Sequence, residues 1–316
     1  MAPPRAGAEP GARSAQTRAG FTAFAGFLLA YLLAVILFGA WVRISGSGAG
    51  CGEHWPTCHG EFVPSNRGAA MVIELTHRVT SAASGLLAIV LPIWAWRRFP
   101  KGHAVRAASL GTLLLILVEG GIGAGLVLNR LVGEDASALR ALVVALHLVN
   151  TLLLTACSAL ALYWSLLPPR MSLGVAWARA GAERYAYALW LLGLVLLSAT
   201  GAVTALGDTL FVNPAGLPMA SPPDAGHFLV RLRVVHPIAA VLLSLLGAGI
   251  VWWLAQRDRL RRAALGLGLL LAAQLVLGAF NIAFDAPGAL QLAHLLLAQL
   301  VWLASVLLLR SALEAR

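Results

Sequence analysis

ELTHRVTSAASGLLAIV, residues 74–90, starts with charged side chains and continues as an apolar run, with a single histidine, His77, near its beginning. RVVHPIAAVLLSLLGAG, residues 233–249, has the same pattern, and aligning the two stretches superposes His236 on His77. Self-similarity over such a distance in the chain is the signature of an internal repeat. The two stretches therefore predict that one structural unit occurs twice.

A second pair of stretches supports the same duplication. VVALHLVNTLLL, residues 143–154, aligns with LQLAHLLLAQLV, residues 290–301, and superposes His147 on His294. The simplest account is two pseudo-symmetric four-helix halves. Because each half then has an even number of spans, both copies have the same orientation, as in parallel repeats.

The composition excludes an ordinary soluble globular protein. The chain is 59% hydrophobic and 11% charged, with a mean hydropathy of +0.82, which is typical of a polytopic membrane protein. A span needs roughly 20 apolar residues, and eight runs are long enough. They lie at about 21–43, 70–96, 105–128, 139–166, 185–206, 231–254, 263–283 and 289–311. We expect an all-α integral membrane protein with eight transmembrane helices in two four-helix bundles.

The distribution of basic residues predicts the orientation. Both terminal segments and the loops between spans two and three, four and five, and six and seven hold 16 of the 23 Lys and Arg residues, whereas the opposite loops and helix edges hold six. The positive-inside rule then places both termini in the cytoplasm. The net charge of +10 is explained by the membrane topology and by contact with the anionic lipid bilayer. It is therefore no evidence for a nucleic-acid partner.

The expected organisation has four segments. Residues 1–19, rich in Ala, Gly, Pro and Arg, are predicted to be a disordered cytoplasmic tail. Residues 20–166 form the N-terminal half, residues 167–183 a cytoplasmic linker, and residues 184–316 the C-terminal half. The first apolar run is too long for a signal peptide, and the tail is unlike an amphipathic transit peptide because it has Gly and Pro interruptions and Glu9. These features favour the bacterial plasma membrane over the mitochondrial inner membrane.

The four span histidines share one depth. Each lies roughly five to nine residues past the outer start of its helix, or on the order of 8 to 14 Å below the outer surface at 1.5 Å per residue. Matched depth and pairing by repeat indicate ligands. Two imidazoles on neighbouring helices suit a haem iron with two axial histidines. Zinc or di-iron would need more ligands, and the Glu-x-x-His of Glu74 and His77 is not repeated, since Arg233 falls at the second position.

Glu74 is the most informative charged residue. An isolated charge within a span costs about 2.5 to 3.5 kcal/mol, so it marks a site. Glu74 lies three residues before His77 on the same helix face, and its carboxylate could approach a porphyrin bound there. The alternative is a structural ion pair with Arg78 at i+4.

Three arginines are candidates for haem propionates. Arg78, Arg231 and Arg233 are near the outer ends of their helices, where guanidinium groups could pair propionates bidentately. Arg231 and Arg233 could equally be ordinary interfacial residues. Because Glu74 aligns with Arg233, we predict that the two halves differ: the haem in one half is chemically modified, whereas the haem in the other half stays bound.

Two cysteines lie in the first outer loop, VRISGSGAGCGEHWPTCHG at residues 42–60. Cys51 and Cys58 are on the oxidising side in a Gly-rich loop, so a disulfide is predicted, either structural or redox-active. The alternatives are a zinc site that adds the neighbouring histidines and a c-type haem attachment, which the six intervening residues disfavour. The third cysteine, Cys157, is interpreted as an apolar packing residue.

Glu119 is the other carboxylate inside a span, in LVEGGIGAG among glycines that permit close helix approach. It could be a proton-relay carboxylate, but we favour a neutral hydrogen-bonding group.

These motifs together resemble one family. The cysteine loop, followed by ELTHR and by single histidines in ALHLVN, RVVHP and QLAHLLLAQ, is similar to the haem A synthase family over nearly the whole chain after residue 20, in the form with a cysteine pair in the first outer loop. The resemblance implies oxidation of the C8 methyl of haem O to a formyl group, which gives haem A for cytochrome oxidase. It implies haem O held by His77 and His147, Glu74 as the catalytic carboxylate, and a permanent haem B on His236 and His294.

Two rival functions remain open at this stage: a b-type cytochrome that carries electrons between two bis-histidine haems, and a haem transporter or chaperone. A carrier across the membrane typically has haems at two depths, and a transporter has no evident need of Glu74. The expected partner is the haem O synthase, protohaem farnesyltransferase. The electron acceptor, the oxygen source and a homo-oligomeric state are left open.

Overall fold

A computed structural model of the chain describes residues 10–62, 64–65, 68–167, 172–211 and 227–314. Within these ranges all regular structure is helical, and eight helical segments are long and apolar enough to cross a membrane. The prediction of an all-α protein with eight spans is confirmed. The long helices are α1 (Pro10–Ile44), α2 (Ala69–Arg98), α3 (Ala104–Leu128), α4 (Ala138–Leu166), α6 (Glu183–Leu210), α8 (Val235–Ala255), α9 (Arg261–Ala283) and α10 (Gly288–Glu314); the short ones are η1 (Ser47–Ala49), α5 (Leu173–Arg179) and α7 (Phe228–Leu232).

Helix α1 begins earlier than the sequence predicted. It starts at Pro10, so residues 10–19 of the expected disordered tail are helical, while residues 1–9 lie outside the described part. Proline is favoured at a first helical position, and no further proline occurs between Pro10 and Ile44. Once the apolar span is helical, each added residue of this Ala- and Arg-rich segment costs little, because nucleation has already occurred.

The sixth span is interrupted near its start. Helix α7 ends at Leu232 and α8 begins at Val235, where the sequence predicted one continuous helix. Pro237 has no N–H to donate to the carbonyl four residues earlier, that of Arg233, and its ring crowds that turn. The break therefore falls where a proline in the first turn of α8 would place it.

The predicted linker contains the short helix α5 between α4 and α6. The side chain of Ser172 accepts a hydrogen bond from the backbone N–H of Val175, 3.4 Å away, and caps the helix. Residues 168–171 of the linker lie outside the described part. The boundaries of the two halves remain predictions.

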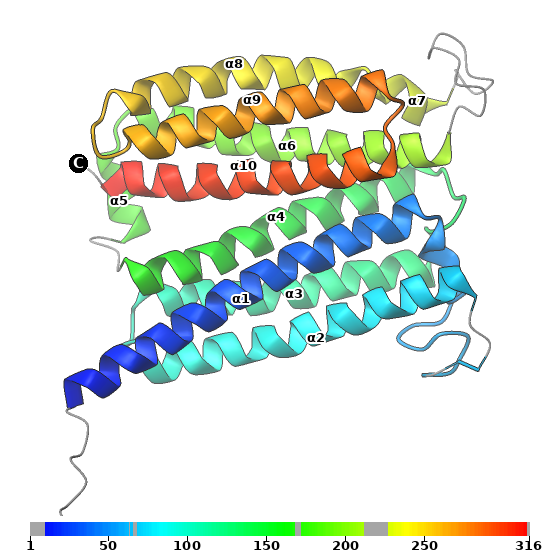
Figure 1. Ribbon diagram of the computed structural model, residues 1–316, viewed down its shortest axis with the longest axis horizontal. Coiled ribbons are helices and arrows are strands. Elements are labelled where there is room, and N and C mark those ends of the chain that lie inside the picture. Colours follow the sequence, from blue (N-terminus) through cyan, green and yellow to red (C-terminus); the bar gives the residue numbers. More distant parts are fainter. Residues whose placement is uncertain (1–9, 63, 66–67, 168–171, 212–226, 315–316) are drawn as a thin grey trace, which may run out of the picture.

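The helices run roughly parallel or antiparallel to one another (Figure 1). Helix α2 packs on α1 and α3, and α4 packs on α3 and α1; in the second half α8 packs on α6 and α9, and α10 packs on α9 and α6. Contacts of α4 with α6 and α10, and of α1 with α10, join the two groups. We call the end that carries the Cys51–Cys58 loop the loop end, and the end where α1 begins and α10 finishes the tail end.

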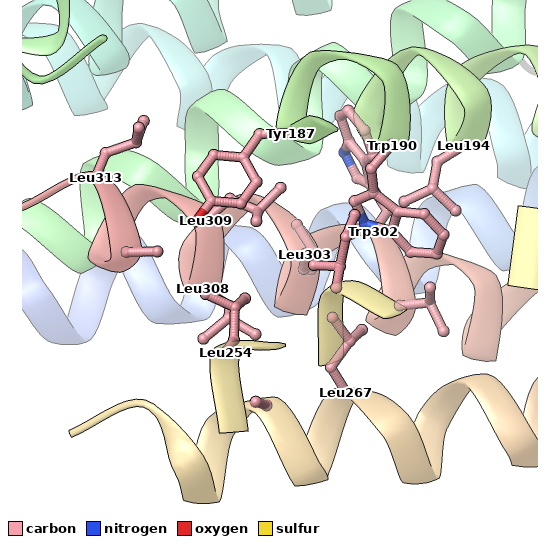
Figure 2. Close-up of a cluster of buried hydrophobic side chains, with 14 of the residues drawn as sticks. Tyr187, Trp190, Leu194, Leu254, Leu267, Trp302, Leu303, Leu308, Leu309 and Leu313 are labelled. Atoms are coloured by element: carbon pink, nitrogen blue, oxygen red, sulfur yellow. The ribbon is translucent and has the colours of Figure 1, made fainter. Parts of the chain in front are cut away.

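The largest buried cluster lies between α6, α8, α9 and α10 (Figure 2). Tyr187 and Trp190 of α6 meet Leu254 of α8, Leu267 of α9 and Trp302 of α10, and each is at most 5% exposed. The indole N–H of Trp302 also donates to the carbonyl of Leu152 on α4, 2.7 Å away. A buried hydrogen bond of this kind ties the second group of helices to α4.

A second cluster joins α1, α2, α3 and α4 with Phe21, Leu28, Leu91, Val105 and Leu154, each at 0% exposure. In the same group, a Cβ on Gly111 of α3 would lie 3.0 Å from the sulfur of Cys157 on α4. This close approach agrees with the interpretation of Cys157 as a packing residue.

Candidate functional site

The four span histidines all lie toward the loop end. His77 is on α2, His147 on α4, His236 on α8 and His294 on α10. Each comes six to nine residues after the first residue of its spanning segment, which corresponds to roughly 9 to 14 Å along the helix. The structure thus places all four at one depth relative to the helix starts, as the sequence predicted.

His236 and His294 face each other across the second group of helices. Their ring centres are 6.4 Å apart and their planes cross at 78°. Nδ1 of His236 lies 3.2 Å from the carbonyl oxygen of Leu197 and 3.2 Å from Oγ1 of Thr200, both on α6. A carbonyl partner requires Nδ1 to be the protonated nitrogen, which leaves the lone pair on Nε2 for a metal.

His294 has a different environment. Its Nε2 lies 3.1 Å from Nε2 of Gln274 on α9, and its Nδ1 is buried without a hydrogen bond among the described residues. A ring nitrogen that is buried and unpaired costs free energy unless a ligand satisfies it.

Glycines on neighbouring helices pack against three of the four imidazoles. A Cβ on Gly39 of α1 would lie 2.9 Å from Cε1 of His77. A Cβ on Gly201 of α6 would lie 2.9 Å from Cε1 of His236, and one on Gly278 of α9 would lie 3.2 Å from Cε1 of His294. Such distances are too short for any other residue without movement of the ring. Each of these three rings therefore packs directly against the backbone of a neighbouring helix.

The donor set fits iron with two axial imidazoles. A metal–imidazole distance of about 2 Å, with about 1 Å more to each ring centre, separates two axial rings by roughly 6 Å, close to the 6.4 Å between His236 and His294. Within the described ranges no three His, Cys, Asp or Glu side chains gather as a metal cluster. The missing ligands would thus come from the group that is bound, as a porphyrin supplies them.

The N-terminal pair has a carboxylate beside it. Nδ1 of His147 lies 3.2 Å from Oε1 of Glu119 on α3. Glu119 also accepts hydrogen bonds from Nδ2 of Asn150 and Oγ1 of Thr151 on α4. On the other ring of this pair, Nδ1 of His77 is buried without a hydrogen bond among the described residues. The sequence singled out Glu119 but not its position against a predicted haem ligand.

Glu74 is buried, at 4% exposure, and both of its oxygens are engaged. Oε2 accepts a hydrogen bond from the backbone N–H of Cys51, 2.8 Å away. Oε1 accepts from Nε of Arg78 at 3.1 Å and forms a short ion pair with Nη2 of the same residue. The ion pair that the sequence offered as an alternative therefore exists, and the hydrogen bond from Cys51 joins the carboxylate to the cysteine loop.

Arg78 binds the loop as well as Glu74. Its Nη1 donates to the carbonyl oxygens of His54, at 2.6 Å, and Thr57, at 2.7 Å. One guanidinium thus fixes Glu74 and the polypeptide around the cysteines together. If Arg78 also paired with a haem propionate, as predicted, its guanidinium group would have to bind the propionate in addition to Glu74 and the two carbonyls.

The cysteine loop is closed by a disulfide between Cys51 and Cys58, whose Cα atoms are 4.4 Å apart. The predicted disulfide is present, so neither cysteine has a thiolate that could bind zinc in the alternative site. The loop lies directly on α2, because a Cβ on Gly50 would come within 2.5 Å of backbone atoms of Ala70. Only glycine allows an approach this close.

The two arginines near the start of the sixth span differ. Arg231 is exposed, as expected for an interfacial residue. The side chain of Arg233 is 11% exposed, and its Nε lies 2.8 Å from Oδ1 of Asp208. Its Nη2 donates to the carbonyls of Gly207 on α6 and of Phe211, the residue directly after α6. Arg233 thus stabilises the interrupted start of α8 against the end of α6.

Arg43 is a residue that the sequence interpretation missed. At the end of α1 its Nη1 donates to the carbonyl of Ala205 and the hydroxyl of Thr209 on α6, and its Nη2 donates to Oε1 of Gln291 on α10, 2.9 Å away. The charge in WVRIS was visible at the end of the first apolar run. Its partners were not, because they come from the other half of the chain.

A family model described as cytochrome oxidase assembly protein, COX15-CtaA, matches residues 22–306. The chain belongs to this family. The resemblance predicted from the cysteine loop and the Glu-x-x-His-Arg element is thereby confirmed. Two similar relatives are named heme A synthase: that of Halalkalibacterium halodurans is 31% identical over 73% of this chain and 75% of its own length, and that of Symbiobacterium thermophilum is 32% identical over 79% and 81%.

Another relative is a Thermus thermophilus protein named protoheme IX farnesyltransferase, which is 44% identical over 294 residues. The match covers 91% of this chain but only 47% of the relative. The chain thus spans about half the length of this relative.

Proposed function

We propose that the protein is a haem A synthase, a membrane oxidoreductase that oxidises the C8 methyl of haem O to a formyl group. The observation that carries the proposal is the pairing of span histidines at one depth, with a buried carboxylate, Glu74, one helical turn from His77. Relatives named heme A synthase that align over about three quarters of both chains support it.

The N-terminal half is proposed to hold the substrate. His77 and His147 would bind the iron of haem O, each through one ring nitrogen. Glu74 lies on the same face of α2 as His77, one turn nearer the loop end, and is fixed by Arg78 and by the N–H of Cys51. A buried carboxylate held in this way is suited to accept a proton from the carbon that is oxidised, or to stabilise positive charge that develops there. The loop above it would exclude water.

The C-terminal half is proposed to hold a permanent haem B on His236 and His294. The ring separation fits one iron between them. When bound, this haem would supply one-electron redox chemistry. Arg233, which corresponds to Glu74 in the alignment of the halves, is paired with Asp208, so no carboxylate occupies the equivalent position on α8.

The proposed setting is the bacterial plasma membrane with both ends of the chain in the cytoplasm. The loop end and the histidines would then lie toward the outer face, where an oxidising environment maintains the Cys51–Cys58 disulfide.

A haem O synthase is the proposed partner. The Thermus thermophilus relative is named for a farnesyltransferase activity, and 47% of it aligns with this chain. This similarity supports a link between the two activities, so we expect the protein to meet a haem O synthase in the membrane. Direct transfer would avoid release of an amphiphilic haem.

Identification of the haems in the purified protein tests the proposed function. The protein is expressed with and without a haem O synthase, and the extracted haems are separated by chromatography. We expect haem B alone in its absence, and haem O or haem A in addition in its presence. Haem B at two per chain in both preparations would instead indicate an electron-carrying cytochrome and would overturn the proposal.

A further inference from the structure

Glu119 is a partly buried carboxylate for which the proposed reaction has no role. It lies in the middle of an apolar helix, α3, with its side chain 16% exposed. Its oxygens meet three groups of α4: Nδ2 of Asn150 and Oγ1 of Thr151 donate hydrogen bonds, and Nδ1 of His147 lies 3.2 Å from Oε1. A carboxylate inside a span is costly, so a function is expected for it.

The hydrogen bond from Thr151 fixes the carboxylate oxygen that lies beside the histidine, whereas the hydrogen bond from Asn150 goes to the other oxygen. Asn150 donates to Oε2 and Thr151 donates to Oε1, so both oxygens act as acceptors. An acceptor beside Nδ1 favours the imidazole tautomer that has its proton on Nδ1. Nδ1 of His147 is buried and has no hydrogen bond of standard geometry to a described residue, which leaves Glu119 as its nearest acceptor. The lone pair is then on Nε2.

The C-terminal half has an amide at the matching place. Gln274 precedes the end of α9 by nine residues, as Glu119 precedes the end of α3, and a Gly-Ala pair follows each four residues later. Gln274 also contacts the histidine of the next helix, with its Nε2 3.1 Å from Nε2 of His294. The two halves thus place a side chain of the same length against the fourth helix, but only the N-terminal one is an acid.

We propose that Glu119 is a positioning residue for His147: its carboxylate, 3.2 Å from Nδ1, keeps the ring oriented with Nε2 toward the substrate haem. The proposal rests on the proposed function, since it takes His147 as a ligand. A carboxylate partner also makes an imidazole a stronger donor to the metal than an amide does. A substrate site is emptied in each turnover, so its ligand must keep its orientation without a metal, whereas a resident haem orients its own ligands.

Two variants separate this role from simple helix packing. Glu119→Gln keeps the size of the side chain, and glutamine is the residue at the matching position, Gln274, in the C-terminal half. We therefore expect this variant to fold as the wild type does. Asn150→Ala removes a hydrogen bond between α3 and α4 but leaves the carboxylate beside His147. If Glu119 positions the ligand, only the first variant changes the properties of the haem on His147.

The measurements are the reduction potentials of the bound haems and the affinity of the purified protein for added ferric haem B. For Glu119→Gln we expect one of the two potentials to rise while the other stays at the wild-type value, and affinity at the N-terminal site to fall about 10- to 100-fold. Asn150→Ala should lower the melting temperature and leave both potentials unchanged. The proposal would be overturned if Glu119→Gln had the same haem potentials and haem B affinity as the wild type. It would also be overturned if Asn150→Ala shifted the potential as much as Glu119→Gln does.

The variant His147→Ala distinguishes a failure of this proposal from a failure of the proposed function. If His147→Ala leaves the haem content and both potentials unchanged, His147 is not a ligand and both proposals fail. If His147→Ala removes one haem and Glu119→Gln has no effect, the site stands and only the positioning role is wrong.

Discussion

Oε2 of Glu74 accepts a hydrogen bond from the backbone N–H of Cys51 at 2.8 Å. The carboxylate that we assign to the reaction and the disulfide loop therefore form one connected structure, in which Arg78 supplies a further contact to each side. We therefore expect a change in the loop to affect the position of the Glu74 carboxylate.

Glu74→Gln is expected to retain bound haem and lose haem A formation by about 10²- to 10⁴-fold, the usual contribution of a general base. The amide can still accept from the N–H of Cys51, but it cannot take up a proton. The ratio of haem A to haem O in membranes measures the effect. Glu61→Gln, an exposed carboxylate of the same loop, is the matched control and should behave as wild type. Full haem A formation by Glu74→Gln would refute the catalytic assignment.

Replacing both cysteines, Cys51→Ser with Cys58→Ser, should lower the free energy of unfolding by about 2 kcal/mol, because the closed loop is short. Turnover should fall as well, because without the disulfide the loop no longer holds the backbone N–H of residue 51 against Glu74. The melting temperature in detergent, with and without reductant, measures the first effect. Cys157→Ala is the control, since Cys157 is the free cysteine within the described residues, and its melting temperature should stay sensitive to reductant. A reductant-insensitive wild type would contradict the prediction.

His236→Ala and His294→Ala should each remove one haem per chain and leave the N-terminal site able to bind, because the two rings are axial ligands of one iron in our proposal. Haem content per protein, determined spectroscopically, measures the loss. His59→Ala changes an exposed loop histidine and should keep the full content. Loss of both haems in either variant, with the fold intact, would show that the sites are not independent.

Gly39→Ala should weaken haem binding at the N-terminal site several-fold, since its Cβ would lie 2.9 Å from Cε1 of His77 and push the ring away. The affinity for added haem B reports the displacement. Gly85→Ala on α2 is the matched control, because a Cβ there meets nothing within 4 Å, and alanine favours the helix over glycine by roughly 1 kcal/mol. Equal affinities in the two variants would show that the contact of Gly39 with His77 is not required.

The spans and the histidine pairs could be predicted from sequence because the bilayer restricts the chain to long apolar helices, and because single polar residues stand out in such runs. The contact between Glu119 and His147 and the three hydrogen bonds of Arg43 could not. They depend on how each helix is rotated against its neighbours, which packing decides. The extent of α1 was missed for another reason. Residues 10–19 are not apolar enough to predict a span, and their helix is a continuation of the apolar span that follows them.

The hydrogen bond between Oγ1 of Thr155 on α4 and Oε1 of Gln299 on α10, 3.2 Å long and buried, joins the two helices that carry His147 and His294. In the proposed enzyme these helices would connect the resident haem to the substrate by backbone and one hydrogen bond. The separation of the two sites would then be fixed by the packing of α4 against α10 within one chain, and would not depend on an encounter between two proteins.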